Sequence, residues 1–200
     1  MTAMNVELLY ALALFAFVSS ITPGPNNLML MASGANYGFR RTLPHMLGVL
    51  VGFVFMLILV GAGLIQLFDA WPPSYDVMRV LSVVYLLWLA WKTATAAGLS
   101  KATEGGRPIT FLQAAAFQWV NPKAWAMAVT AMTAYAPDRS ISAVVVVAAL
   151  FGLINLPSIS SWTLLGQQMA RFLTSQRRRV AFNVTMAVLL VASLYPVLQL

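Results

Sequence analysis

The sequence predicts an all-α integral membrane protein with six transmembrane helices, arranged as two inverted three-helix repeats in which the first and fourth helices are broken at proline. Three observations lead to this prediction. Of the 200 residues, 60% are hydrophobic and 8% charged, and the mean hydropathy is +0.81, far from the balance of a soluble domain. The apolar sequence falls into six runs, most of them near the ~20 residues that span hydrocarbon. Two of these runs contain proline breaks at corresponding positions.

The first three apolar runs cover residues 8–36, 43–67 and 77–97. We expect helices, because open strands would leave backbone groups unpaired in lipid. The first run is longer than one span needs, and the stretch TPGPNN interrupts it at residues 22–27. Turn signals at Gly38-Phe39-Arg40-Arg41 and Trp71-Pro72-Pro73 separate the three runs.

The second three runs cover residues 111–135, 141–165 and 180–198. A connection with Gly105-Gly106 precedes them, and Pro137-Asp138-Arg139 and residues 166–179 lie between them. The fourth run is again interrupted by proline, at Asn121-Pro122. Three spans are an odd number, so a second repeat must lie inverted relative to the first, with residues 1–98 forming one repeat and residues 99–200 the other within one membrane domain.

The distribution of lysine and arginine predicts the orientation. The first, third and fifth connections hold nine cations: Arg40, Arg41, Lys92, Lys101, Arg107, Arg171, Arg177, Arg178 and Arg179. The second and fourth hold only Arg79 and Arg139. Both termini should therefore face outward from the cytoplasm. No removable signal is expected at the N-terminus, because Glu7 rather than a basic segment precedes the first apolar run.

The amino-acid composition also excludes several classes of function. A net charge of +7 would suggest nucleic acid for a soluble protein, but here the cations lie in short loops, where bilayer topology accounts for them. With no cysteine and one histidine, thiol chemistry and metal cages rich in Cys or His are excluded. We expect no cofactor, no bound metal and no nucleic-acid partner. Lipids are the surrounding partners, and the sequence leaves open whether the protein forms a homo-oligomer.

The two proline breaks predict a binding site within the membrane. Thr22 and Asn121 are residue types that cap helices, and a proline follows each at a favourable first helical position. A half-helix beginning there has free N–H groups with partial positive charge, which lipid tolerates only where the backbone lines a polar cavity. An anionic group is the natural occupant of such a cavity. The candidate residues are Thr22, Pro23, Gly24, Pro25, Asn26, Asn27, Asn121, Pro122, Lys123 and Asn155.

Lys123 adds a cation to this site. It lies about 12 residues, or some 18 Å, from the inner end of the fourth span, which places it near the middle of the membrane. A lysine at that depth costs an isolated helix roughly 2.5–3.5 kcal/mol, so it should face protein or water, where it can meet a substrate carboxylate. The alternative is a structural lysine that snorkels or bonds neighbouring carbonyl groups.

The chain resembles the LysE/RhtB superfamily of amino-acid exporters, and most of all the RhtB-type exporters of homoserine, threonine and cysteine with O-acetylserine. The resemblance rests on four stretches in both halves of the chain. They are TPGPNNLMLMASGANYGFRR at 22–41, LGVLVGF at 47–53, YLLWLAWK at 85–92 and FQWVNPKAWAMAVTA at 117–131. The resemblance implies six membrane spans and the export of small amino acids or their derivatives by an antiport that protons drive. The motifs of the family correspond to Pro23 to Asn26 and to Asn121 to Lys123.

Coupling and rival functions stay open at this point. The five acidic residues all map to loops or helix ends, so no carboxylate is expected in mid-membrane to relay protons. His45 is expected at the membrane interface. An ion or metal transporter or channel of the same architecture is the main alternative. An intramembrane enzyme would need a nucleophile and a base, such as Ser158, Ser160 or Ser161 paired with Lys123, and we expect no enzyme. A membrane scaffold without transport activity would not explain two proline breaks at matched depth.

Overall fold

The computed structural model describes residues 6–96, 107–136 and 140–195, apart from the side chain of Leu67. Every regular element in these ranges is a helix, which confirms the all-α prediction. The helices are α1 (Val6–Ile21), α2 (Pro25–Gly61), α3 (Leu64–Ala70), α4 (Pro73–Thr95), α5 (Phe111–Trp119), α6 (Pro122–Tyr135), α7 (Ile141–Met169) and α8 (Gln176–Ala192). Of these, α2, α4 and α7 are long and apolar enough to cross a membrane, and α1 is a shorter apolar helix.

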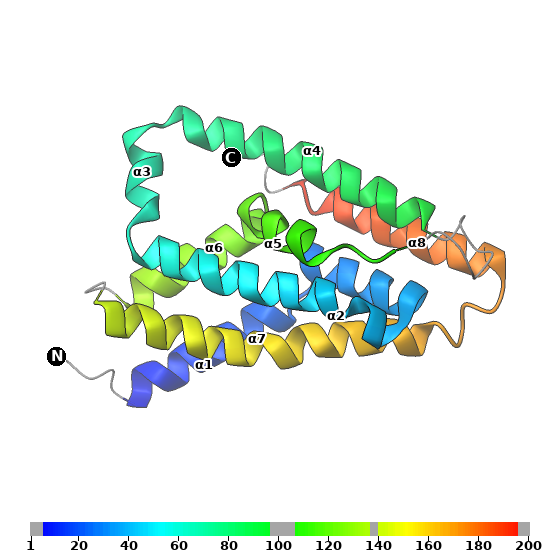
Figure 1. Cartoon of the computed structure of the whole chain (residues 1–200), viewed down its shortest axis with the longest axis horizontal. Helices are drawn as coiled ribbons and strands as arrows, with labels where there is room; N and C mark the ends of the chain where they lie inside the picture. Colours follow the sequence, from blue (N-terminus) through cyan, green and yellow to red (C-terminus); the bar gives the residue numbers. More distant parts are fainter. Residues whose placement is uncertain (1–5, 97–106, 137–139, 196–200) are drawn as a thin grey trace.

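The chain runs back and forth between two ends of an elongated bundle (Figure 1). Helix α1 and the first part of α2 lead from one end to the other. At Gly38, where φ is 77° and ψ is 168°, α2 changes direction, and its second part returns toward the end where α1 begins. A positive φ of this size favours glycine. The bend is also held by hydroxyl groups, since Thr42 donates to the Gly38 carbonyl at 2.8 Å and lies 2.9 Å from the hydroxyl of Ser33.

The predicted apolar runs correspond to these elements, with different ends. The run predicted at 43–67 ends as a helix at Gly61, where α2 stops, and the short helix α3 follows. Helix α4 begins at Pro73 rather than 77, α7 extends to Met169 rather than 165, and α8 begins at Gln176 rather than 180. The prolines at the start of α4 occupy favourable first-turn positions, which accounts for its earlier start.

Both predicted interruptions are present. Helix α1 ends at Ile21 and α2 begins at Pro25, while α5 ends at Trp119 and α6 begins at Pro122. The six-span topology and the inverted repeat remain predictions. The proposed boundary between repeats, at residues 98 and 99, lies outside the described residues.

Close backbone contacts hold α2 against α7 and α5. A Cβ atom added at Gly166 would lie 1.9 Å from the Met31 carbonyl oxygen, and one at Gly34 would lie 2.1 Å from the Thr163 carbonyl oxygen. At Gly48 it would lie 2.3 Å from the carbonyl oxygen of Phe111. These helices therefore approach as closely as only glycine permits. The packing fixes the first proline break, at the start of α2, relative to α5 and α7.

Candidate functional site

The first break is shaped by the residues between α1 and α2. Gly24 is extended, with φ of −169°, and serves as the N-cap of α2, with Pro25 at the first helical position. The expectation that Thr22 caps this half-helix is wrong, because its hydroxyl donates instead to the Val18 carbonyl one turn back in α1. No hydrogen bond from the N–H groups of Asn26 and Asn27 is seen in the described part of the chain, as expected for the first turn of a helix.

The carbonyl groups at the end of α1 are satisfied by side chains. The amide of Asn27 donates to the carbonyl oxygens of Ser20 at 2.8 Å and Thr22 at 2.9 Å. The indole N–H of Trp162, from α7, donates to the Ile21 carbonyl at 3.1 Å. Asn27 therefore ties the end of α1 to the start of α2 across the break.

The second break has the predicted cap. The side-chain oxygen of Asn121 accepts the N–H of Lys123 at 3.2 Å, and its carbonyl accepts the N–H of Trp125 at 3.2 Å. Pro122 occupies the first helical position of α6. The role expected of Asn121 as a helix cap is therefore confirmed.

The two breaks adjoin, although about a hundred residues separate them in sequence. The Lys123 ammonium donates to the Thr22 carbonyl at 2.6 Å and to the Pro23 carbonyl at 3.5 Å. The structural alternative considered for Lys123, bonding to neighbouring carbonyl groups, is thus realised in this conformation. The lysine also lines the cavity described below, so the two roles do not exclude each other.

A reciprocal pair of amides also joins the breaks. Asn26 donates to the Gln118 side-chain oxygen at 2.8 Å, and Gln118 donates back at 3.1 Å and to the Ala114 carbonyl at 2.9 Å. Gln118 is fully buried. Gln118 was not among the residues predicted for the site, although a glutamine three residues before Asn121-Pro122-Lys123, within an apolar run, was a visible signal.

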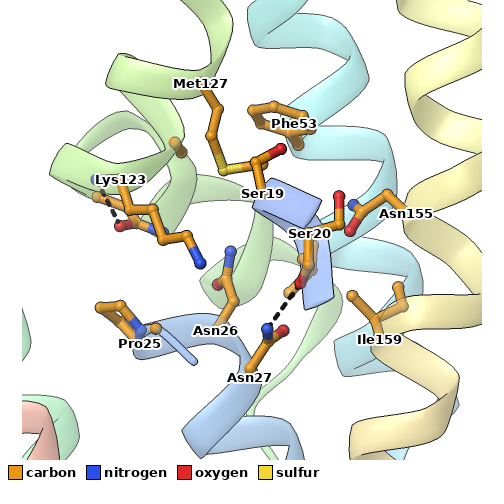
Figure 2. Close-up of a pocket in the computed structure, with 14 residues that line it drawn as sticks. Ser19, Ser20, Pro25, Asn26, Asn27, Phe53, Lys123, Met127, Asn155 and Ile159 are labelled. Carbon is orange, nitrogen blue, oxygen red and sulfur yellow. Dashed lines mark hydrogen bonds between the residues drawn. The ribbon is translucent and has the colours of Figure 1, made fainter. Parts of the chain in front are cut away.

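A small cavity lies where the two breaks meet (Figure 2). Its volume is about 30 Å³, which is room for one or two water molecules and not for an amino acid. Polar lining is contributed by the breaks and by Ser19, Ser20 and Asn155, and apolar lining by Val49, Phe53, Met127 and Ile159. In Figure 2 Lys123 and Pro25 lie to the left of the view, and Ser20 and Asn155 to the right.

The structure brings most of the predicted site residues to this cavity. Those that line it are Gly24, Pro25, Asn26, Asn27, Asn121, Lys123 and Asn155. Thr22 and Pro23 do not line it and instead supply carbonyl oxygens to Lys123. Pro122 lines a separate, apolar pocket together with Trp125 and Phe68.

The electrostatic balance of the cavity is positive. Lys123 is the one charged side chain in its lining, and the free N–H groups of α2 add partial positive charge. The described acidic residues Glu7, Asp69 and Asp76 do not line it, and Glu104 and Asp138 lie outside the described residues. The cavity therefore suits a small molecule with a negatively charged group.

The side chains bear on two further expectations. The His45 side chain is fully buried inside the protein, and neither ring nitrogen has a hydrogen-bond partner; its position at the membrane interface stays a prediction. The Ser–Lys pair of an intramembrane enzyme does not form in this conformation. Ser160 and Ser161 donate to backbone carbonyls of α7, while Lys123 bonds the first break.

Comparison with known proteins agrees with the family resemblance found in the sequence. The family model described as LysE type translocator matches residues 17–194. The chain is 30% identical over 193 residues to the cysteine/O-acetylserine efflux protein of Escherichia coli strain K12, covering 94% of this chain and 96% of that protein. The protein of the same description from Shigella sonnei has the same identity and coverage. No solved structure matches.

Proposed function

The chain belongs to the LysE type translocator family, and from this premise we propose that it exports small amino acids or their derivatives across the bacterial inner membrane. Its similarity to efflux proteins for cysteine and O-acetylserine makes these compounds, with threonine and homoserine, the first substrates to consider. In this proposal the protein is a secondary transporter without an enzymatic activity, and a proton gradient drives export.

The observation that carries the proposal is the cavity at the junction of the two helix breaks. A carboxylate placed between the start of α2 and Lys123 would accept hydrogen bonds from the unpaired N–H groups of Asn26 and Asn27 and from the Lys123 ammonium group. Charge-assisted hydrogen bonds of this kind are among the strongest in proteins. Every α-amino acid carries the required carboxylate.

The conformation described here suits a state without substrate. Its cavity has room for one or two water molecules, and Lys123 is held by the Thr22 carbonyl. Substrate binding would therefore widen the cavity and transfer the ammonium from the Thr22 carbonyl to the substrate carboxylate. The Thr22 carbonyl would not be left unpaired, because Asn27 also donates to it.

Alternating access follows if this exchange is coupled to movement of one repeat relative to the other. Lys123 belongs to the proposed second repeat and Thr22 to the first. The bond between them closes the junction when the site is empty, and a substrate carboxylate competes for the same ammonium. In this way binding would weaken one contact between the repeats and favour their relative movement.

The proposed orientation follows from the positions of the cationic segments. The bend of α2, the end of α4 and the connection from α7 to α8 lie at one end of the bundle (Figure 1). Arg40 and Arg41 follow the bend of α2, and the run Arg177-Arg178-Arg179 lies in the first turn of α8, directly after the connection from α7. We assign this end to the cytoplasm, in line with the positive-inside rule, and the opposite end, where α1 begins, to the outside.

An ion or metal transporter is the alternative, and no observation favours it. Within the described ranges, no group of three or more His, Cys, Asp or Glu residues could hold a metal ion. The charged lining residue is a cation, which would repel metal ions and sodium.

The test is counterflow in proteoliposomes that contain the purified protein. Vesicles loaded with unlabelled cysteine, O-acetylserine, threonine or homoserine should accumulate the same labelled compound from outside, whereas protein-free vesicles should not. Repeating the assay at several pH differences across the membrane would test proton coupling. If no small amino acid exchanges while a cation flux is present, the proposal is wrong and the alternative holds.

A further inference from the structure

Two polar side chains that line the cavity have no hydrogen-bond partner among the described residues. Ser20 at the end of α1 is 4% exposed, and Asn155 in the middle of α7 is 6% exposed. The Ser20 hydroxyl has no hydrogen-bond partner, and within the described residues no bond from the Asn155 amide is found. Both line the cavity, on the side away from Lys123 in Figure 2.

An unpaired polar group inside a membrane protein is unfavourable, because neither lipid nor apolar side chains can replace its lost hydrogen bonds. Other polar groups of the site are paired: Asn26 with Gln118, Asn27 with the end of α1, and Lys123 with Thr22. Among the side chains that line the cavity, those without a partner in the described residues, Ser20 and Asn155, therefore lie on one side, while the free backbone N–H groups of α2 lie on the other. The two side chains are arranged to bind something that enters the cavity.

We propose that Ser20 and Asn155 hydrogen-bond the polar atom at the end of a short, neutral substrate side chain, a hydroxyl or thiol group. This inference rests on the proposed export function. With the carboxylate held at Lys123, the α-ammonium nitrogen lies two bonds from the carboxylate carbon, whereas the hydroxyl lies three bonds away in serine and four in homoserine. The side-chain atom is therefore the part of the substrate that reaches across the cavity.

The remaining lining limits the substrate in two ways. Val49, Phe53, Met127 and Ile159 form apolar walls around a small volume, which disfavours long side chains. No carboxylate lines the cavity to balance a second positive charge, so lysine and arginine should be excluded by the cost of desolvating their side-chain cations. The substrate class is thus the small neutral amino acids with a hydrogen-bonding side chain.

Pairs of amino acids of equal size test this assignment. Homoserine and norvaline differ in a hydroxyl group against a methyl group, and so do serine and 2-aminobutyrate. Competition of each compound with labelled homoserine would be measured in counterflow with the complete protein in proteoliposomes. The wild-type protein should favour the hydroxyl compound of each pair by about tenfold, as expected for one or two hydrogen bonds to a buried site.

The variants are Ser20→Ala and Asn155→Leu, with Ser158→Ala as the matched control. Ser158 also has a buried hydroxyl without a partner, at 3% exposure and one turn along α7 from Asn155, but it does not line the cavity. Ser20→Ala and Asn155→Leu should bring the ratio of the apparent affinities for homoserine and norvaline close to one. The main change should be weaker binding of homoserine. The Ser158→Ala protein should keep the wild-type ratio.

Two results would overturn the assignment. One is an unchanged ratio in both cavity variants; the other is an equal loss for homoserine and norvaline, which would place the α-ammonium, and not the side chain, at Ser20 and Asn155. If Asn155→Leu does not fold, the smaller change Ser20→Ala carries the test alone. Failure of the wild-type protein to exchange any amino acid would instead refute the export function, and this inference with it.

Discussion

Replacing Lys123 by methionine should abolish most substrate binding while leaving the protein folded. The side chain of methionine is apolar and similar in length, so the change removes the charge and little volume. In the described conformation it removes the 2.6 Å bond from the ammonium to the Thr22 carbonyl. That carbonyl keeps a second donor, the Asn27 amide at 2.9 Å.

The expected effect on stability is small because two terms oppose each other. A hydrogen bond involving a charged group contributes about 1.5–3 kcal/mol, whereas removing a lysine from the mid-membrane depth predicted for Lys123 regains roughly 2.5–3.5 kcal/mol on insertion scales. The substrate carboxylate loses its charged partner with no such compensation. A loss of about 1.5–3 kcal/mol corresponds to binding weaker by about 10- to 100-fold.

The measurement is counterflow of labelled substrate, together with substrate-dependent thermal stabilisation of the purified protein. Lys92→Met is the matched control, because Lys92 is a half-buried lysine that contacts Gln113 and the Trp88 ring and does not line the cavity. Loss of both signals in Lys123→Met but not in Lys92→Met supports the account. Full activity of Lys123→Met in a folded protein would refute the proposed role of the ammonium group.

Three further predictions concern the junction, the packing and the topology. Asn26→Ala and Gln118→Ala should each weaken substrate-dependent thermal stabilisation, and a double-mutant cycle should give a coupling of about 0.5–3 kcal/mol; additive effects would mean that their reciprocal hydrogen bonds contribute nothing. Gly166→Ala should prevent correct folding, measured as loss of the monodisperse peak in detergent, because its Cβ would lie 1.9 Å from a backbone oxygen of α2; a variant of wild-type stability would contradict the described contact between α2 and α7. The protein has no cysteine, so single substitutions report topology directly: Ser74→Cys should react with an impermeant maleimide added outside cells and Ser175→Cys only after permeabilisation, and the reverse pattern would invert the proposed orientation.

The sequence was sufficient to locate the helix breaks, because the signals for them are local. Proline removes a backbone donor wherever it occurs, and Asn121 before Pro122 specifies a cap without help from the rest of the fold. At the first break two prolines compete, and the sequence alone favoured Pro23 with Thr22 as its cap. The structure uses Pro25, with Gly24 as the N-cap. Choosing between two adjacent starts depends on tertiary contacts, here the bonds of Asn27 and Lys123 to the end of α1.

Other features depend on distant parts of the chain and could not be predicted. The pairing of Asn26 with Gln118 requires knowing that the two breaks meet. The burial of His45 depends on the rotation of the second part of α2 after the bend at Gly38. The proposed role of Ser20 could not be predicted either, because it depends on the lack of a hydrogen-bond partner for its hydroxyl in the folded protein. The periodicity of apolar residues assigns such residues to a helix, but it does not show which residues of other helices they contact.

Binding of a substrate carboxylate to the Lys123 ammonium at the junction of the two breaks can be tested most directly by a distance measurement. Solid-state NMR of the reconstituted protein would detect dipolar coupling between a ¹³C-labelled carboxylate on bound substrate and ¹⁵N-labelled lysine ammonium groups. The chain has three lysines, Lys92, Lys101 and Lys123, and Lys123→Met identifies the signal. We expect a carbon-to-nitrogen distance of about 4 Å or less and loss of the coupling in Lys123→Met. Bound substrate with no coupling to any lysine would contradict the account.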